Sequence, residues 1–99
     1  MRVISRKTLV QFWTKHRDAE QPLKAWFREA GQAHWSSPNE LKQQFPSASI
    51  LSSNRVVFNI KGNKYRLIVA VAYKIGVVYI QFIGTHKEYD AVDAETVEM

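Results

Sequence analysis

Six consecutive residues near the end of the chain, Thr85-His86-Lys87-Glu88-Tyr89-Asp90, have side chains that can donate, accept or carry a proton. RNA cleavage without a metal ion needs a base for the ribose 2′ proton, cations for the charged phosphorane and an acid for the leaving 5′ oxygen. His86 is the best proton carrier of the six near neutral pH, and Asp90 can orient it. Lys87 can stabilise the negative charge of a phosphate, and Tyr89 can stack on a nucleobase or orient a hydroxyl. Without further evidence, such a string is more often a surface turn than a catalytic site.

A second group of candidates surrounds the dipeptide Gly62-Asn63. If this dipeptide is a two-residue hairpin loop, Lys61 pairs with Lys64 and Asn59 pairs with Arg66. The four side chains then share one face of the sheet. Like charges directly opposite each other cost up to about 1 kcal/mol, and a bound phosphate would remove that cost.

Each of these cations also has a structural explanation. Lys61 and Lys64 can simply keep a hairpin tip soluble, and Arg66 can form an ion pair with a helix carboxylate. Arg66 lies inside a strand, however, and its planar guanidinium suits two phosphate oxygens. His16, His34 and the three tryptophans are assigned to packing, hydrogen bonding or partner contact.

The composition narrows the possible functions. A chain with no cysteine has no disulfide, no thiolate zinc site and no cysteine nucleophile, and its three histidines lack the spacing of metal ligands. We therefore expect neither a metal nor a cofactor. No apolar run approaches the ~20 residues that span a bilayer, and the charged N-terminal segment is unlike a signal peptide, so we expect a cytoplasmic protein.

Positive charge is concentrated in the centre of the chain. The net charge is +5, and residues 54–87 contain six Lys or Arg, one His and no acid. Such a block suits a polyanion or an acidic protein partner.

Hydrophobic periodicity predicts the elements that position these residues. Ser5 and the Ser37-Pro38-x-Glu40 capping box mark helix starts, Gly31 marks a helix end, and the acidic end after Asp90 is expected to fray. Together they describe one α+β domain over residues 1–99, with two N-terminal helices packed on a small, mainly antiparallel sheet. The predicted elements are a short strand at 1–4, helices at 6–16, 22–31 and 38–45, and a three-strand meander at 56–60, 65–73 and 77–85.

The register of the last two strands decides which residue of the C-terminal cluster faces Arg66. Counting through a three-residue turn pairs Arg66 with Gly84 and places His86 on the basic face. A bulge at the turn would shift the register by one residue and present Lys87 instead, and Gln81 favours the shift because it would otherwise point into the core. In both registers we expect Arg66 and the cluster to share one solvent-facing groove.

These segments resemble the HigB branch of the RelE/ParE toxin superfamily. The resemblance covers nearly the whole chain, including the order of helices before sheet, and the hexamer is its most specific part. It implies a metal-independent messenger-RNA interferase that cuts codons in the ribosomal A site, with a HigA-type helix-turn-helix antitoxin as partner. The segments that carry it are Val57-Phe58-Asn59-Ile60, Gly62-Asn63, Tyr65-Arg66 and residues 85–90.

The resemblance also assigns site residues. The superfamily's strand arginine falls on Arg66, and its C-terminal catalytic cluster falls on His86, Lys87, Tyr89 and Asp90. We expect the RNA-binding residues to be Asn59, Lys61, Lys64, Arg66 and Lys87. Which residue is the acid and which the base stays open. A non-catalytic RNA-binding module and a gyrase-targeting toxin are the alternatives, although the dense C-terminal cluster favours cleavage.

Overall fold

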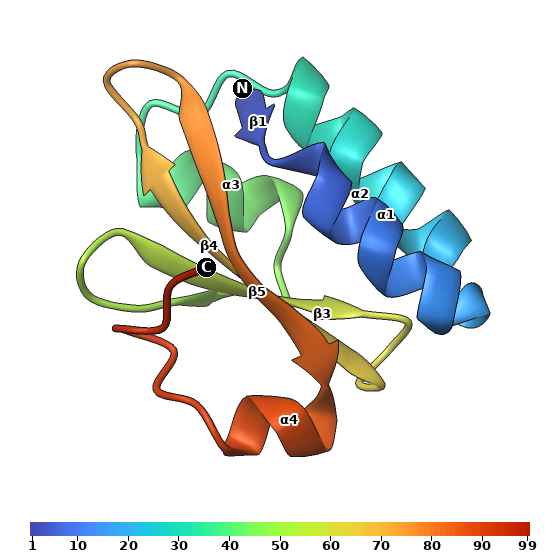
Figure 1. Cartoon of the computed structure of the whole chain (residues 1–99). Helices are drawn as coiled ribbons and strands as arrows, with labels where there is room; N and C mark the ends of the chain where they lie inside the picture. Colours follow the sequence, from blue (N-terminus) through green and yellow to red (C-terminus); the bar gives the residue numbers. More distant parts are fainter.

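The computed structural model describes residues 1–99 as a five-stranded sheet with three helices on one face (Figure 1). The strand order is β1-β5-β4-β3-β2, and only the β1–β5 pair is parallel. The predicted α+β class is therefore confirmed. The elements are β1 (Arg2–Ile4), α1 (Arg6–Lys15), the 3₁₀ turn η1 (Arg17–Ala19), α2 (Glu20–Gln32), α3 (Pro38–Gln44), β2 (Ser49–Ile50), β3 (Arg55–Ile60), β4 (Tyr65–Ala72), β5 (Val77–Thr85) and α4 (His86–Asp90).

The predicted elements agree closely with this list, with two omissions. Each predicted strand ends within one residue of its observed bounds, and α1, α2 and α3 are present. β2 and α4 were not predicted. Gly31 does not end α2, because it keeps a helical backbone and the helix continues to Gln32. None of the helices combines the length and the apolar composition needed to cross a membrane.

A single cluster of buried side chains joins the helices to one face of the sheet, here called the inner face. Leu9 and Trp13 of α1 and Leu23 and Trp26 of α2 are its main helical members. Alternate strand residues complete it, as expected where one sheet face is covered and the side-chain period is two. These strand residues include Val56, Phe58, Ile60, Tyr65, Leu67, Val69 and Val71.

The register of the β3–β4 hairpin matches the prediction. Asn59 pairs with Arg66 and Ile60 pairs with Tyr65. Asn59 and Arg66 consequently belong to the opposite, outer face of the sheet. The tight turn between the strands uses left-handed backbone at Lys61 and Gly62, with φ of 56° and 64°.

The β4–β5 pair follows the unshifted register beside Arg66 but not beside the turn. Arg66 pairs with Gly84, as the unshifted count predicts, whereas Ala72 pairs with Val77, one residue away from that count in the direction opposite to the predicted shift. The change occurs between Ile68 and Val69, where Gln81 has no partner on β4. The alternative of a bulge at the turn that presents Lys87 is therefore wrong, and the observed bulge lies at Gln81 in the middle of β5.

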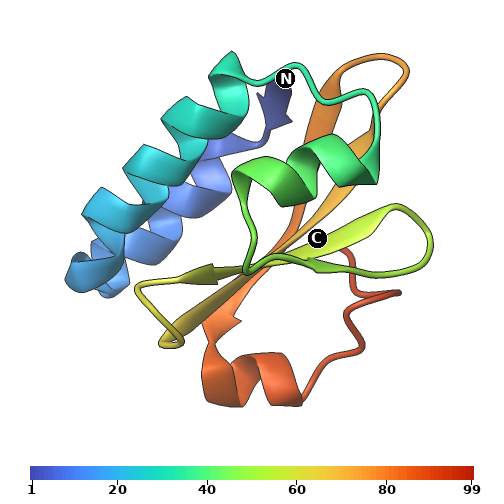
Figure 2. The ribbon, with the colours of Figure 1, turned by 180° about the vertical axis from the view of Figure 1, so that it is seen from behind.

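The C-terminal segment 91–99 crosses the outer face, on the side of the sheet away from α3 (Figures 1 and 2). Arg55 is only 7% exposed, and its Nη1 donates hydrogen bonds to the carbonyl oxygens of Val97, at 2.5 Å, and Ala94, at 3.4 Å. The prediction that this end frays is wrong, because a buried guanidinium from β3 holds two of its carbonyl groups.

This segment has an apolar surface beneath it. Val57 and Ile68 pair across β3 and β4, are at most 3% exposed, and do not belong to the inner core. A hydroxyl on Ser52 also donates to the Glu95 carboxylate. The outer face is therefore covered along part of its length and open near the β3–β4 turn and at Tyr79 of β5, which is 37% exposed.

We predict that Arg55→Met releases segment 91–99. The substitution keeps an apolar stem but removes hydrogen bonds from a charged donor, so the free energy of unfolding should fall by about 1–3 kcal/mol. Cleavage after Glu95 by a glutamate-specific protease should become faster. Arg2→Met is the matched control, since Arg2 is exposed on β1 and its side chain makes no hydrogen bond. Equal cleavage of the wild type and Arg55→Met would contradict the tether.

Candidate active site

Arg66 and the segment that follows β5 meet at the open end of the outer face. The guanidinium carbon of Arg66 lies 5.7 Å from the centre of the Tyr89 ring. The ring centres of Tyr89 and His86 are 6.5 Å apart. The backbone N–H of His86 continues the ladder by donating to the carbonyl of Lys64 at 3.2 Å. The structure thus brings together the two groups of residues that the sequence placed side by side.

A capping box turns the C-terminal cluster into the short helix α4. The Thr85 hydroxyl accepts from the Glu88 backbone N–H at 3.2 Å, and the Glu88 carboxylate accepts from the Thr85 N–H at 2.8 Å. The helix then places His86, Tyr89 and Asp90 at positions i, i+3 and i+4, which lie on one helical face. Sequence reasoning missed this helix, although the Thr-x-x-Glu spacing was its signal.

His86 and Asp90 form a hydrogen-bonded pair on that face. The Nδ1 of His86 is 3.1 Å from the Asp90 carboxylate, and each side chain is more than half exposed. Since a carboxylate only accepts, this contact requires a proton on Nδ1, and in the neutral imidazole Nε2 is then the acceptor. The arrangement gives a histidine held in one orientation by an acid, with its second nitrogen open to solvent.

Arg66 keeps much of its hydrogen-bonding capacity. Its Nη1 donates to the carbonyl of Asn63 at 2.9 Å and more weakly to that of Tyr65 at 3.4 Å, and no carboxylate lies in ion-pair contact with it. The alternative role as the partner of a helix carboxylate is therefore not realised. The other N–H groups of the half-buried guanidinium remain available to two oxygens of a phosphate.

Lys64 takes the role that was considered for Arg66. Its ammonium lies 2.5 Å from the carboxylate of Asp18 in η1, which also accepts from the Tyr65 hydroxyl at 2.5 Å. The bond from Lys64, followed by that from Tyr65, lowers the pKa of Asp18, and the carboxylate raises the pKa of Lys64. Burial, with Asp18 as the second cause, raises the pKa of Tyr65. Lys64 is thus drawn toward the helices and away from Arg66, because a carboxylate is within its reach.

The other predicted RNA-binding residues lie around Arg66. Asn59 is half-buried on β3 as the cross-strand partner of Arg66, and Lys61 is exposed at the hairpin turn. Lys87 is exposed on α4, and its side chain makes no hydrogen bond or ion pair. Two exposed lysines therefore lie in the β3–β4 turn and in α4, the segments that flank Arg66.

Of the other two histidines, His16 packs as the sequence suggested, whereas the same prediction for His34 is wrong, because its side chain is exposed and makes no hydrogen bond or ring contact. His16 stacks on Phe12, with ring centres 4.4 Å apart, and meets the Tyr65 ring edge-on at 5.4 Å. His34 is exposed beside the N-terminal strand, far along the chain from the cluster. No three His, Asp or Glu side chains gather closely enough to hold a metal ion.

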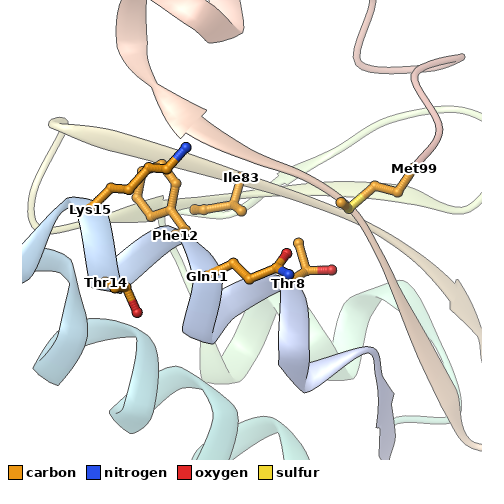
Figure 3. A pocket seen from close by; sticks show the side chains of 7 residues that line it. All are labelled: Thr8, Gln11, Phe12, Thr14, Lys15, Ile83 and Met99. Carbon is orange, nitrogen blue, oxygen red and sulfur yellow. The ribbon is translucent and has the colours of Figure 1, made fainter.

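The cluster lies on an open surface. Five hollows mark the protein, and none is lined by Arg66 or by a residue of α4. A hollow of about 560 Å³ lies instead between α1 and β5, with Lys15 at one end and Met99 at the other (Figure 3). The prediction of a shared groove is therefore wrong, whereas that of a shared face is confirmed.

Phe82 and Gly84 explain why no groove forms beside Arg66. A Cβ atom added to Gly84 would lie 2.6 Å from Cζ of Phe82 and 3.0 Å from the Glu88 carboxylate oxygen. The phenyl ring and the capping carboxylate thus occupy the space over Gly84 that a groove would require. Glycine at this position allows β5, Phe82 and the α4 cap to pack together.

Comparison with known proteins shows the family of this chain. The profile of the HigB toxin family, described as the RelE-like toxic component of a toxin-antitoxin system, matches residues 19–92. The mRNA interferase toxin HigB of Escherichia coli K12 is 30% identical over 92 residues, which cover 91% of this chain and 88% of that protein. Proteins named mRNA interferase HigB from Escherichia coli O157:H7 and Shigella flexneri match to the same extent. The matched residues include Arg66 and the whole of α4.

We predict that Gly84→Ala loosens α4. The new methyl group must push aside the Phe82 ring or the Glu88 carboxylate, so the amide proton of Thr85 should lose its protection against hydrogen exchange. Gly31→Ala is the control, because no atom lies within 4 Å of the added Cβ and its backbone is helical. That variant should keep or raise the stability of the fold. Unchanged exchange at Thr85 would show that the packing over Gly84 is not tight.

We predict that Asp18→Asn lowers the melting temperature at pH 7. Because the pKa of Asp18 is lower in the folded protein than its ordinary value of 3.8, its stabilising effect is complete above that value. The effect disappears as the pH falls through the lower, folded-state pKa. Thermal unfolding should therefore separate the variant from the wild type at pH 7 and bring them together at strongly acidic pH. Glu98→Gln, at an exposed site without hydrogen bonds, should show no such pattern.

Proposed function

This chain belongs to the HigB family of RelE-like toxins, and from that membership and the geometry of its outer face we propose that it is a ribosome-dependent mRNA endonuclease. The observation that carries the proposal is the contact of Arg66 with Tyr89, next to the His86–Asp90 pair. These side chains include a proton acceptor, an orienting carboxylate and a cation within one patch. The relatives named mRNA interferase support the reaction class.

The proposed reaction is attack by a ribose 2′ oxygen on its own 3′ phosphate. Nε2 of His86 removes the 2′ proton, while Asp90 holds the imidazole through Nδ1. The new bond joins the 2′ oxygen to phosphorus, and the bond from phosphorus to the 5′ oxygen breaks. Arg66 and Lys87 stabilise the negative charge of the phosphorane. The leaving 5′ oxygen takes a proton from an acid, for which Lys87 and Tyr89 are the candidates, so no metal ion is needed.

The open surface supports a role for the ribosome. Correct placement of the 2′ oxygen in line with the leaving oxygen supplies much of the rate of such a reaction. This surface has no groove that could impose that placement alone. We propose that the ribosomal A site holds the mRNA, while Asn59, Lys61 and Lys87 contact it together with Arg66. Lys64 joins them only when it leaves Asp18.

A toxin that cuts mRNA must be neutralised in the cell that makes it. Membership of a toxin–antitoxin family implies an antitoxin, and we propose a HigA-type helix-turn-helix protein in this role. Both proteins would meet in the cytoplasm, where the ribosomes are. The net charge of +5 suits an acidic partner surface.

We predict that His86→Ala and Arg66→Ala each abolish growth arrest on expression. General-base catalysis contributes about 10²–10⁴-fold, and loss of one stabilising cation about 10²–10³-fold, so cleavage of mRNA on programmed ribosomes should fall by those factors. His34→Ala and Arg28→Ala are the matched controls, because both residues are exposed and lie outside the cluster. Both controls should cut at the wild-type rate.

Four other outcomes would reject the proposal. Arrest with intact mRNA, or arrest that survives a double variant carrying both Arg66→Ala and His86→Ala, would exclude cleavage by this cluster. Salt-sensitive RNA binding without cleavage would instead indicate a non-catalytic binding module. Inhibition of purified gyrase in a supercoiling assay would indicate a toxin of the other branch of the superfamily.

A further inference from the structure

The hollow of about 560 Å³ between α1 and β5 takes no part in the proposed reaction (Figure 3). β1 pairs with β5 only from Val77 to Tyr79, so the same edge of β5 carries no strand from Ile80 to Thr85. Ile83, which lines the hollow, belongs to this strandless part. Hollows of about 300–1,000 Å³ are large enough to hold a bound group. This edge of the sheet therefore has room for an occupant that the chain does not supply.

Apolar side chains line the hollow and reach its surface. Phe12 and Ile83 are half-buried, and Met99 is 69% exposed. The hydrogen bond from Arg55 anchors Val97, and Met99 follows two residues later at one end of the hollow. These three side chains present apolar surface that a partner can cover.

More exposed apolar surface lies along the same edge of the sheet. Ile4 and Tyr79 are direct neighbours across β1 and β5, and each is 37% exposed. Tyr79 points to the outer face, because Val78 and Ile80 on either side of it belong to the inner core. Together with Met99 they are three of the five large apolar side chains that the chain exposes. Exposed apolar side chains gathered in one region mark an interaction surface.

The charge around the hollow is mainly positive. Residues 1–17 contain five Lys or Arg and no acid, and the first acid, Asp18, is already paired with a lysine. Lys15, which lines the hollow, is exposed and makes no ion pair. One acid, Glu98, lies beside Met99 in the sequence, at the end of the hollow opposite to Lys15. A complementary partner therefore places carboxylates beside Lys15 and the rest of α1.

The combination of apolar lining and positive charge favours a protein over RNA. Interfaces with nucleic acid are more polar than those with protein, and a phosphate backbone cannot cover apolar side chains. A protein segment can fill a hollow with one large apolar side chain and surround it with charged groups. Membership of a toxin–antitoxin family implies such a protein partner.

We propose that an acidic segment of the antitoxin binds this surface, defined as the hollow and the neighbouring exposed edge of β1 and β5. One large apolar side chain of the segment fills the hollow, and its carboxylates lie beside Lys15. The bound segment is close to the active cluster, because Ile83 directly precedes Gly84, the cross-strand partner of Arg66. The inference rests on the proposed function, since it names the surface on which the proposed antitoxin binds.

Isothermal titration calorimetry with the purified cognate antitoxin tests this surface. The protein is the full chain carrying His86→Ala, so that it can be produced without arresting growth. Gln11→Trp adds an indole at an exposed position that lines the hollow and should fill it. We expect antitoxin binding to weaken by about tenfold or more. Gln43→Trp is the matched control and should leave the affinity unchanged, because it lies at an exposed position of α3 outside all five hollows.

A charge reversal tests the acidic character of the bound segment. Lys15→Glu should slow association and weaken binding by about tenfold at low salt, and the loss should shrink as salt screens the charges. Lys74→Glu makes the same change at an exposed, unpaired lysine of the β4–β5 turn and should affect binding far less. Thermal unfolding checks that these exposed substitutions leave the fold intact.

The possible results separate this surface from the cleavage reaction. Unchanged affinity in Gln11→Trp overturns the surface, whether or not the wild type cuts mRNA, and unchanged affinity in Lys15→Glu overturns the acidic character of the segment. Self-association of the chain that Gln11→Trp abolishes also overturns the proposal, in favour of a second copy. If both variants lose antitoxin binding although the wild type fails to cut mRNA, the cleavage proposal fails and the docking surface stands.

Discussion

The bulge at Gln81 is the constraint on which the candidate site depends. A bulge changes which face successive residues of a strand present. Here it keeps Ile83 packed against the inner core while Gly84 comes opposite Arg66. β5 therefore ends beside the arginine, and the capping box at Thr85 folds the next residues into α4 at that place. Without the extra residue, Ile83 would occupy the position beside Arg66, and the cluster would start from the wrong face.

Local patterns in the sequence were sufficient for most of the fold. The dipeptide Gly62-Asn63 gave the register of the hairpin, and with it the outer position of Asn59 and Arg66. Ser37 as the N-cap and Pro38 as the first residue likewise predicted the start of α3. Helix α4 was missed although its capping box is a local signal, and other errors came from contacts between residues far apart in the chain. Asp18 holds Lys64 across 46 positions. Arg55 holds the end of the chain through carbonyl groups, which no side-chain pattern can reveal.

The candidate site combines a residue on a rigid strand with reacting groups that are exposed. Arg66 belongs to a central strand, yet His86 and Lys87 stand on a helix of five residues with little around them. Phe82 fills the space in which a groove would hold a substrate. Such a site can supply acid, base and charge but does little to position RNA. That division of roles agrees with the proposal that the ribosome positions the substrate.

The chemistry of the cut ends tests the central claim most directly, because it reports which atom attacks the phosphorus. mRNA cut on programmed ribosomes can be recovered and its termini analysed by mass spectrometry. Attack by the ribose 2′ oxygen, driven by the His86 and Arg66 surface, predicts a 2′,3′-cyclic phosphate or its 3′-phosphate product on one fragment and a 5′ hydroxyl on the other. Fragments with a 3′ hydroxyl and a 5′ phosphate would show that water attacks instead, and would contradict the account.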